Sequence, residues 1–473
     1  MRQIQGMFFP TAMGLALLLG GASEADASNG TIKGTLRFHN KNGSYCPTGA
    51  TCTGSTYKQT SYNVLVGIPE VEVQVIRASD GVAIGTGSTD SGGNYQIAWT
   101  SGAGTSDVPA KLRVRWKHKN GRFQFHKLGN TPHSLLQLDR AVTLTHGTTA
   151  GAPQQGSLTY GNSATPEPMA NLYWAAWKMN AKLQSSSRMV SFFTSLDILA
   201  FEASPSGTVK TNANCAKNSC AIPARYSDPP ERPAWAEKSL TLVLDGHGAT
   251  PYTPMKLMHE MGHMADFISG PVGNSVRGLR RETSYCYGES GSCPWTMTST
   301  EYLPSALTEG LASFLAMTAF YDGSGSVAYH CNANGNVSHL SHCYPPDTSF
   351  AVMSMEAKAT CASPMARRPY NAMRFFWDIY DTPADGTDAT DLDIGEIFDS
   401  LAAWPCTGYP ACYGAGQLHD QFSSVSASLY LTAPNASQLD EGNATRFRDN
   451  MLNNYSGHDN VTGAYNQNCM GNP

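Results

Sequence analysis

The run His259-Glu260-Met261-Gly262-His263 combines two imidazoles and a carboxylate at a spacing that suits metal chemistry. On an α-helix, residues four apart lie on one face, so both histidines can reach one ion while Glu260 lies beside them. Imidazole nitrogens are ligands of catalytic zinc, which keeps one position open for a water molecule that a neighbouring carboxylate can deprotonate. The run therefore predicts a zinc centre with His259 and His263 as ligands and Glu260 as general base.

The flanking residues predict the helix that such a site needs. Thr253 can cap its start, Pro254 suits its first turn, and Gly270-Pro271 stops it. The two histidines fall on one face with Asp266, and an apolar stripe lies on another: Met258, Met261, Ala265 and Ile268. The alternative interpretations are a chance match in a chain with 13 His, and a purely structural role for the run.

A catalytic zinc has three protein ligands, so one more must come from elsewhere in the chain. The metzincin continuation needs Gly at position 266 and His or Asp at position 269. This chain has Asp266 and Ser269 there, which excludes the metzincin pattern.

A second strong helix, predicted from Pro304 to Tyr321, offers the missing ligand in Glu309. The small residues Gly310 and Ala312 would let this helix approach the metal helix closely. Glu309 is therefore the favoured third ligand. Two other carboxylates remain as alternative ligands, Glu301 and Glu282.

With these residues the chain resembles the gluzincin metallopeptidases, the thermolysin-like and aminopeptidase-like enzymes in which two His and a distant Glu hold zinc. The resemblance covers the stretch from about Leu240 to Trp404 and rests on the first run and on Glu309-Gly310-Leu311-Ala312. It implies a zincin-like domain, one zinc ion on His259, His263 and Glu309, and Glu260 as general base. Thermolysin-like enzymes place an Asp four residues after the ligand Glu, where it supports a His. Here that position is Ser313, so the supporting carboxylate would instead be Asp266.

The same resemblance implies a peptide or protein substrate. In zincins, the strand that precedes the metal helix is a sheet edge that binds an extended peptide by strand addition, and Ser239–Asp245 is the predicted strand in this position. Hydrolysis also needs a donor for the oxyanion. Five side chains are candidates, each with a structural role as the alternative: Tyr285, Tyr287, Arg367, Arg368 and Tyr370.

Upstream, residues 28–146 predict an all-β sandwich. Segments such as Val71–Ile76, Tyr95–Trp99 and Lys111–Trp116 alternate apolar and polar side chains with a period of two. The part from Gly67 to Trp99 resembles the carboxypeptidase-regulatory or transthyretin-like modules beside many secreted enzymes, which implies a spacer, platform or docking module. Residues 147–168 predict an exposed linker, and a helix over Asn171–Leu183 opens a second domain, 169–473. The predicted fold is thus an N-terminal all-β sandwich followed by an α+β, zincin-like metallopeptidase domain.

Residues 1–27 predict a signal peptide, with Arg2, the apolar run Met13–Leu19 and Ala25-Asp26-Ala27 in the expected order. The 12 Cys agree with an oxidising compartment. The closely spaced ones predict small-loop disulfides, with the last pair assigned by elimination: 46–52, 215–220, 286–293, 331–343, 406–412 and 361–469. We therefore expect a secreted or periplasmic protein.

Charge and hydropathy limit the partners. A formal net charge of −5 gives no basic surface for nucleic acid, and the apolar run of the signal peptide is too short to span a bilayer. Five Asp between Asp381 and Asp393 suggest calcium, but the spacing does not fit an EF-hand, which favours a solvated loop whose Asp residues cap a helix over Ile394–Trp404. Two functions follow: a secreted zinc-dependent peptidase, or an exported binding or surface protein whose zinc is structural.

Overall fold

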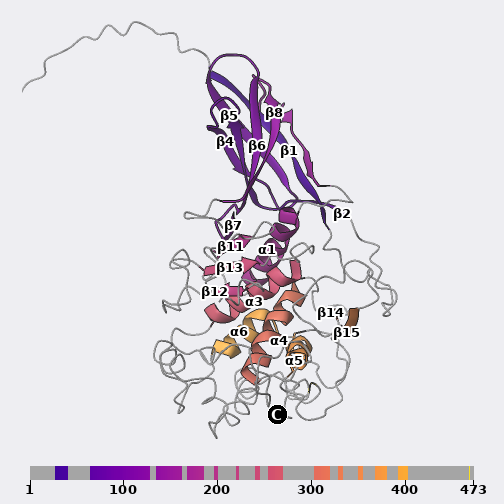
Figure 1. Cartoon of the computed structure of the whole chain (residues 1–473). Helices are drawn as coiled ribbons and strands as arrows, with labels where there is room; N and C mark the ends of the chain where they lie inside the picture. The colour runs from indigo at the N-terminus through magenta and orange to yellow at the C-terminus, as the bar shows by residue number, and fades with distance from the viewer. Residues whose placement is uncertain are drawn as a thin grey trace, which may run out of the picture.

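The computed structural model describes residues 27–40, 64–127, 135–161, 168–185, 196–200, 220–222, 240–244, 254–269, 303–319, 329–333, 350–354, 368–380, 392–402 and 468. In these ranges two mixed β-sheets come first along the chain and most of the helices follow (Figure 1). Residues 1–26 and at least one partner of every predicted disulfide lie outside them, as does most of the Asp-rich loop. None of the described helices is long and apolar enough to cross a membrane.

The first sheet is built on the long strand β1 (Ala27–Asn40). It pairs antiparallel with β5 (Asn94–Ala103) along its first part and with β2 (Val64–Gly67) along its end. Two short strands, β9 (Gln154–Gln155) and β10 (Leu158–Tyr160), run parallel to β1. Part of the predicted linker 147–168 therefore lies along this sheet, although most of its described residues are exposed or half-buried.

The second sheet faces the first across the core of the sandwich. Its antiparallel strands here are β4 (Ala83–Ser88), β3 (Val71–Arg77), β6 (Val108–His118) and β8 (Gln137–Leu144), in this spatial order. The predicted alternation is confirmed in β3, β5 and β6, where every second residue is buried: Val71, Val73, Val75, Tyr95, Ile97, Trp99, Leu112, Val114 and Trp116. The outward positions carry charged residues that pair along the sheet, such as Arg113 with Asp139 at 2.8 Å.

This second sheet continues beyond the sandwich. After β6 the chain turns into β7 (Phe123–Lys127), which pairs in parallel with β11 (Leu196–Ala200) along its whole length. Next come β13 (Leu240–Leu244), parallel to β11, and β12 (Cys220–Ile222), antiparallel to β13. The expectation that the strand before the metal helix is a sheet edge is therefore wrong. Strand β13 has a neighbour on each side, whereas among the described strands β12 pairs with β13 alone.

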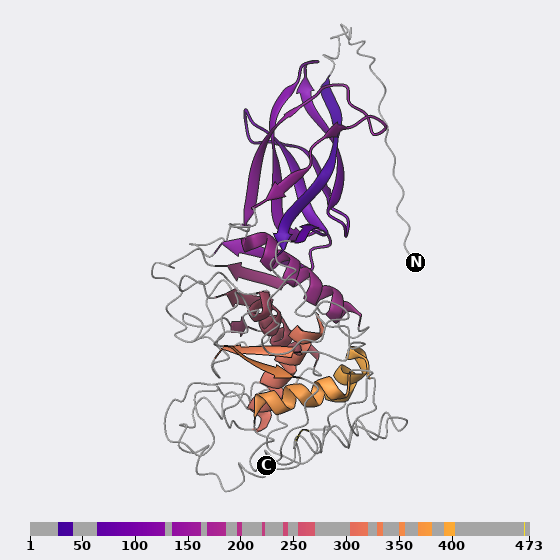
Figure 2. The same ribbon diagram turned by 90° about the vertical axis from the view of Figure 1, so that its right-hand side faces the viewer.

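The helices lie on the side of the molecule away from the tip of the sandwich (Figure 2). They are α1 (Pro168–Gln184), α3 (Pro254–Ser269), α4 (Leu303–Thr318), α5 (Pro369–Asp378) and α6 (Ile394–Ala402). Those predicted from the sequence are confirmed to within a few residues at each end. Helix α1 packs against both β6 and α3, α3 packs against β12 and β13, and α4 lies against α3 and α5. A separate hairpin consists of β14 (Tyr329–Ala333) and β15 (Phe350–Ser354).

Helix α6 begins with a reciprocal cap at Asp393 and Glu396. The Glu396 amide donates to Asp393 Oδ1 at 2.8 Å, and the Asp393 amide donates to Glu396 Oε2 at 2.9 Å. Such a capping box satisfies two backbone donors that the first turn of a helix leaves open. The predicted capping role of this end of the Asp-rich loop is confirmed.

Candidate metal centre

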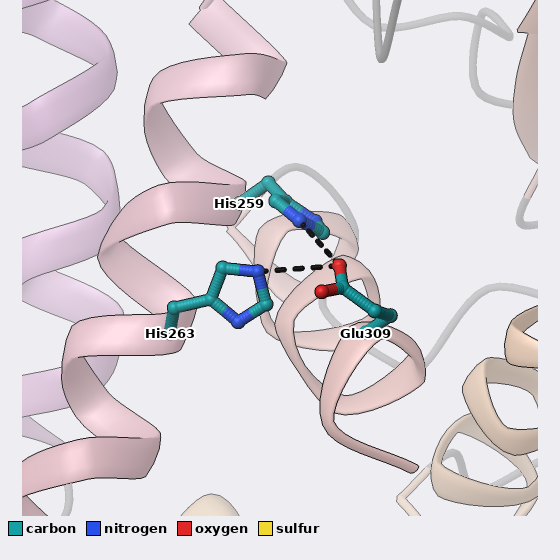
Figure 3. A group of neighbouring side chains, drawn as sticks. All are labelled: His259, His263 and Glu309. Carbon is teal, nitrogen blue, oxygen red and sulfur yellow. Dashed lines mark hydrogen bonds and ion pairs between the residues drawn. The ribbon is translucent and has the colours of Figure 1, made fainter. Parts of the chain in front are cut away.

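The two histidines of the opening run project from α3 toward a carboxylate of α4 (Figure 3). Nε2 of His259 lies 3.1 Å from Oε2 of Glu309, and Nε2 of His263 lies 3.2 Å from the same oxygen. The imidazole rings are 4.4 Å apart between centroids and nearly perpendicular, at 80°. Glu309, the favoured third ligand, thus lies beside both histidines.

These distances suit a metal ion. One ligand atom from each of His259, His263 and Glu309 lies within 4.8 Å of the others, and all three residues are buried. Atoms held ~2.05 Å from a tetrahedral ion lie about 3.3 Å from one another. The measured N···O separations of 3.1 and 3.2 Å are close to that value.

The charges of the buried residues at this site also favour a metal ion. Glu309 is 7% exposed, and so is Glu260, which follows His259 on α3. Burying ionised carboxylates is costly unless a cation compensates them. With both carboxylates ionised and both histidines neutral, the four residues carry a charge of −2, which a divalent cation would balance. Glu260 and His263 are also three residues apart on one helix, so their side chains are neighbours on its surface.

The close approach of α3 and α4 depends on Gly262, inside the histidine run. A Cβ atom at Gly262 would lie 2.8 Å from the carbonyl oxygen of Ala312 and 2.9 Å from its Cα. Glycine therefore lets α3 lie directly on the backbone of α4. This contact confirms the role predicted for Ala312.

Gly310 has a different partner from the one predicted. A Cβ at this position would meet Cβ of Ala372 at 2.5 Å and the amide nitrogen of Met373 at 2.7 Å, both on α5. Helix α4 is therefore closely packed on two sides, by α3 at Ala312 and by α5 at Gly310. The sequence shows that both residues are small, but not which neighbouring helix each one faces.

Ser313 lies behind His259 and is fully buried. Its Oγ is 3.2 Å from Nδ1 of His259, on the side of the ring away from Glu309. Ser313 follows Glu309 by one helical turn, so the two side chains share a face of α4. In the sequence, Ser313 stands out only as a departure from the thermolysin-like pattern, which favours Asp266 as the supporting group. The side chain of Asp266 lies outside the described residues.

Of the remaining predicted site residues, Arg368 and Tyr370 lie within the described part of the chain. Glu282, Glu301, Tyr285, Tyr287 and Arg367 lie outside the described residues. Arg368 directly precedes α5, and Tyr370 lies in its first turn. The guanidinium of Arg374 lies 5.4 Å from the centre of the Tyr370 ring, and burial raises the pKa of the Tyr370 phenol. These contacts give Tyr370 a packing role on α5, and its role as an oxyanion donor stays a prediction.

No protein-family model matches this chain, and no curated protein matches it in sequence.

Proposed function

We propose that this chain is an exported, zinc-dependent peptidase of the gluzincin type that hydrolyses peptide bonds. The observation that carries the proposal is the convergence of His259 and His263 on Glu309 from two separate helices, in a buried setting and beside Glu260. Two imidazoles and one carboxylate form a ligand set of catalytic zinc, in which the fourth position is left for water or substrate.

In this proposal each residue has one task. Zinc bound at the centre would polarise the scissile carbonyl and make a water molecule acidic. His259, His263 and Glu309 hold the ion. Glu260 takes the proton from the attacking water and passes it to the leaving nitrogen, so that one carboxylate acts first as base and then as acid.

The sheet beside α3 suggests where a peptide would lie. Among the described strands, β12 has only one neighbour, which is β13. Helix α3 packs against both of these strands. We place the substrate as an added strand on the outer side of β12, in place of the β13 edge that the resemblance implied. Main-chain hydrogen bonds would hold such a peptide, and pockets for its side chains would set specificity.

Export is part of the proposal and rests on the sequence. The predicted signal peptide and the 12 Cys favour a secreted or periplasmic protein. The alternative function, an exported binding or surface protein, would use the same three ligands for a structural zinc. A structural site needs a fourth protein ligand and no base.

The test combines metal content with proteolysis. The purified full-length chain is expected to hold one zinc per molecule and to cleave a casein mixture, with cleavage lost on chelation and restored by zinc. Mass spectrometry of the products then locates the cleaved bonds. One bound zinc with four protein ligands and no cleavage would favour the alternative, and a chain that binds no zinc would contradict both.

A further inference from the structure

The two ring nitrogens of His259 face different partners. Nε2 lies 3.1 Å from Oε2 of Glu309, and Nδ1 lies 3.2 Å from Oγ of Ser313. Ser313 and His259 are 0% and 5% exposed, so neither group is well placed to exchange this contact for one with bulk water. Glu309 and Ser313 stand one turn apart on α4, which fixes the spacing between them.

We propose that Ser313 is a positioning residue of the metal centre. Its hydroxyl oxygen accepts the Nδ1–H of His259 and thereby keeps the lone pair of Nε2 directed at the metal position. This inference rests on the proposed zinc site and assigns to it a support that the thermolysin-like resemblance does not supply.

The chemistry of imidazole requires an acceptor for Nδ1–H when Nε2 binds a metal. A neutral imidazole carries one N–H, and the nitrogen that binds a metal must be the unprotonated one. A metal on Nε2 therefore requires the proton on Nδ1, and a buried N–H without an acceptor costs about 1–3 kcal/mol. Ser313 provides an acceptor at that place, so it selects both the tautomer and the ring orientation.

A hydroxyl at this position also has an electrostatic consequence. Glu260 and Glu309 already balance the charge of a divalent ion, and both are buried. A carboxylate at position 313 would add a third negative charge to the same enclosed region. Serine orients His259 without that charge. An aspartate there is therefore expected to strengthen metal binding while it destabilises the metal-free protein through repulsion between carboxylates.

Four full-length variants test the inference. Ser313→Ala removes the acceptor, Ser313→Thr keeps a hydroxyl, and Ser313→Asp adds the charge. Thr318→Ala is the matched control, because Thr318 is a buried hydroxyl on the same helix that bonds to the Leu315 carbonyl oxygen at 2.8 Å instead of to a ligand. The zinc dissociation constant is measured by competition with a chromophoric chelator, and the visible spectrum of the cobalt-loaded protein reports the ligand geometry. The unfolding midpoint of each metal-free variant is measured alongside.

Ser313→Ala is expected to weaken zinc binding by about 10- to 100-fold and to change the cobalt spectrum. Ser313→Thr is expected to bind zinc within a few-fold of the parent, and Ser313→Asp to bind it more tightly while its metal-free form melts earlier. Thr318→Ala is expected to keep the parent's affinity even if its midpoint falls. An unchanged affinity and spectrum in Ser313→Ala would overturn this inference alone, as would equal losses in Ser313→Ala and Thr318→Ala. A parent protein that binds no zinc would overturn the proposed function as well.

Discussion

The indole Nε1 of Trp177 on α1 donates a hydrogen bond of 3.0 Å to Oε2 of Glu70, in the turn between β2 and β3. The same carboxylate receives Lys119 Nζ at 2.7 Å and lies 3.1 Å from Nε2 of His118. The hydroxyl of Tyr173, also on α1, donates to the Glu70 carbonyl oxygen at 3.0 Å. One residue of the sandwich thus binds the first helix of the helical part through both its side chain and its backbone.

The backbone of Glu70 is held in an unusual conformation. Its φ of 51° lies in the left-handed region, which costs a non-glycine residue about 1–2 kcal/mol. Hydrogen bonds on both sides hold it there, from its own amide to the Asp90 carbonyl oxygen and from the Lys119 amide to its own carbonyl oxygen. Burial raises the pKa of Glu70, but hydrogen bonds from Lys119 and Trp177 outweigh burial and leave this pKa below its ordinary value.

Trp177→Phe tests this connection. The variant keeps most of the ring but leaves Glu70 without one donor, so the free energy of unfolding is expected to fall by about 1–3 kcal/mol. Trp174→Phe is the matched control, because both indoles contact Lys178 while the bond to Glu70 belongs to Trp177. Denaturant unfolding followed by circular dichroism measures both variants. Equal losses in the two would show that the hydrogen bond to Glu70 contributes nothing specific.

His118 predicts a pH dependence of stability. Burial lowers the pKa of His118 below its ordinary value of 6.5, although Glu70 partly opposes this effect. The unfolded chain therefore takes up a proton at higher pH than the folded one. Stability is expected to be complete above pH 6.5 and to fall as the pH drops from there toward the lowered pKa.

The variant His118→Gln removes this titrating group. The expected result is a smaller loss of unfolding free energy between pH 7 and pH 5 than in the parent. These two pH values lie about half a unit or more above and below an ordinary histidine pKa. Equilibrium unfolding at a series of pH values measures the difference. Parallel pH curves for the two proteins would show that His118 does not govern acid sensitivity in this range.

The contact between α3 and α4 predicts a specific effect of Gly262→Ala. The added methyl would lie against the backbone of Ala312, so the helices must separate, at a cost of about 1–3 kcal/mol. Because the histidines and Glu309 lie on these two helices, zinc affinity is expected to fall as well. Gly151→Ala serves as the control, because a Cβ at Gly151 would lie 3.9 Å from Oγ1 of Thr149, an ordinary van der Waals contact. Normal zinc affinity in Gly262→Ala would separate helix packing from metal binding.

Local pattern was enough to predict several parts of the fold. Strands such as β3 and β6 bury one face and expose the other, so their period of two reports burial directly. Helices α3 and α4 carry long apolar stripes, and Glu309 follows from the ligand chemistry that the two histidines require. The strands and helices depend on residues close together in the chain, whereas Glu309 lies 46 residues beyond His263 and was selected for its ligand chemistry.

Long-range pairing could not be predicted in the same way. The parallel partnership of β7 with β11 joins segments about 70 residues apart, and no local pattern in Phe123–Lys127 distinguishes a strand that ends a sandwich from one that continues into a second part. The neighbours of β13 on both sides escaped prediction for the same reason. Ser313 was visible from its position one turn after Glu309, but its contact with His259 depends on how α3 and α4 pack.

The most direct test of the central claim is the rate of peptide hydrolysis by Glu260→Gln at full zinc occupancy. Gln keeps the size of the side chain and cannot accept the proton, so the rate is expected to fall by at least ~10²-fold while one zinc stays bound. Zinc content is measured on the same sample, which separates loss of the base from loss of the metal. A zinc-loaded variant that cleaves peptides as fast as the parent would contradict the assignment of Glu260 as the base and, with it, the proposed mechanism.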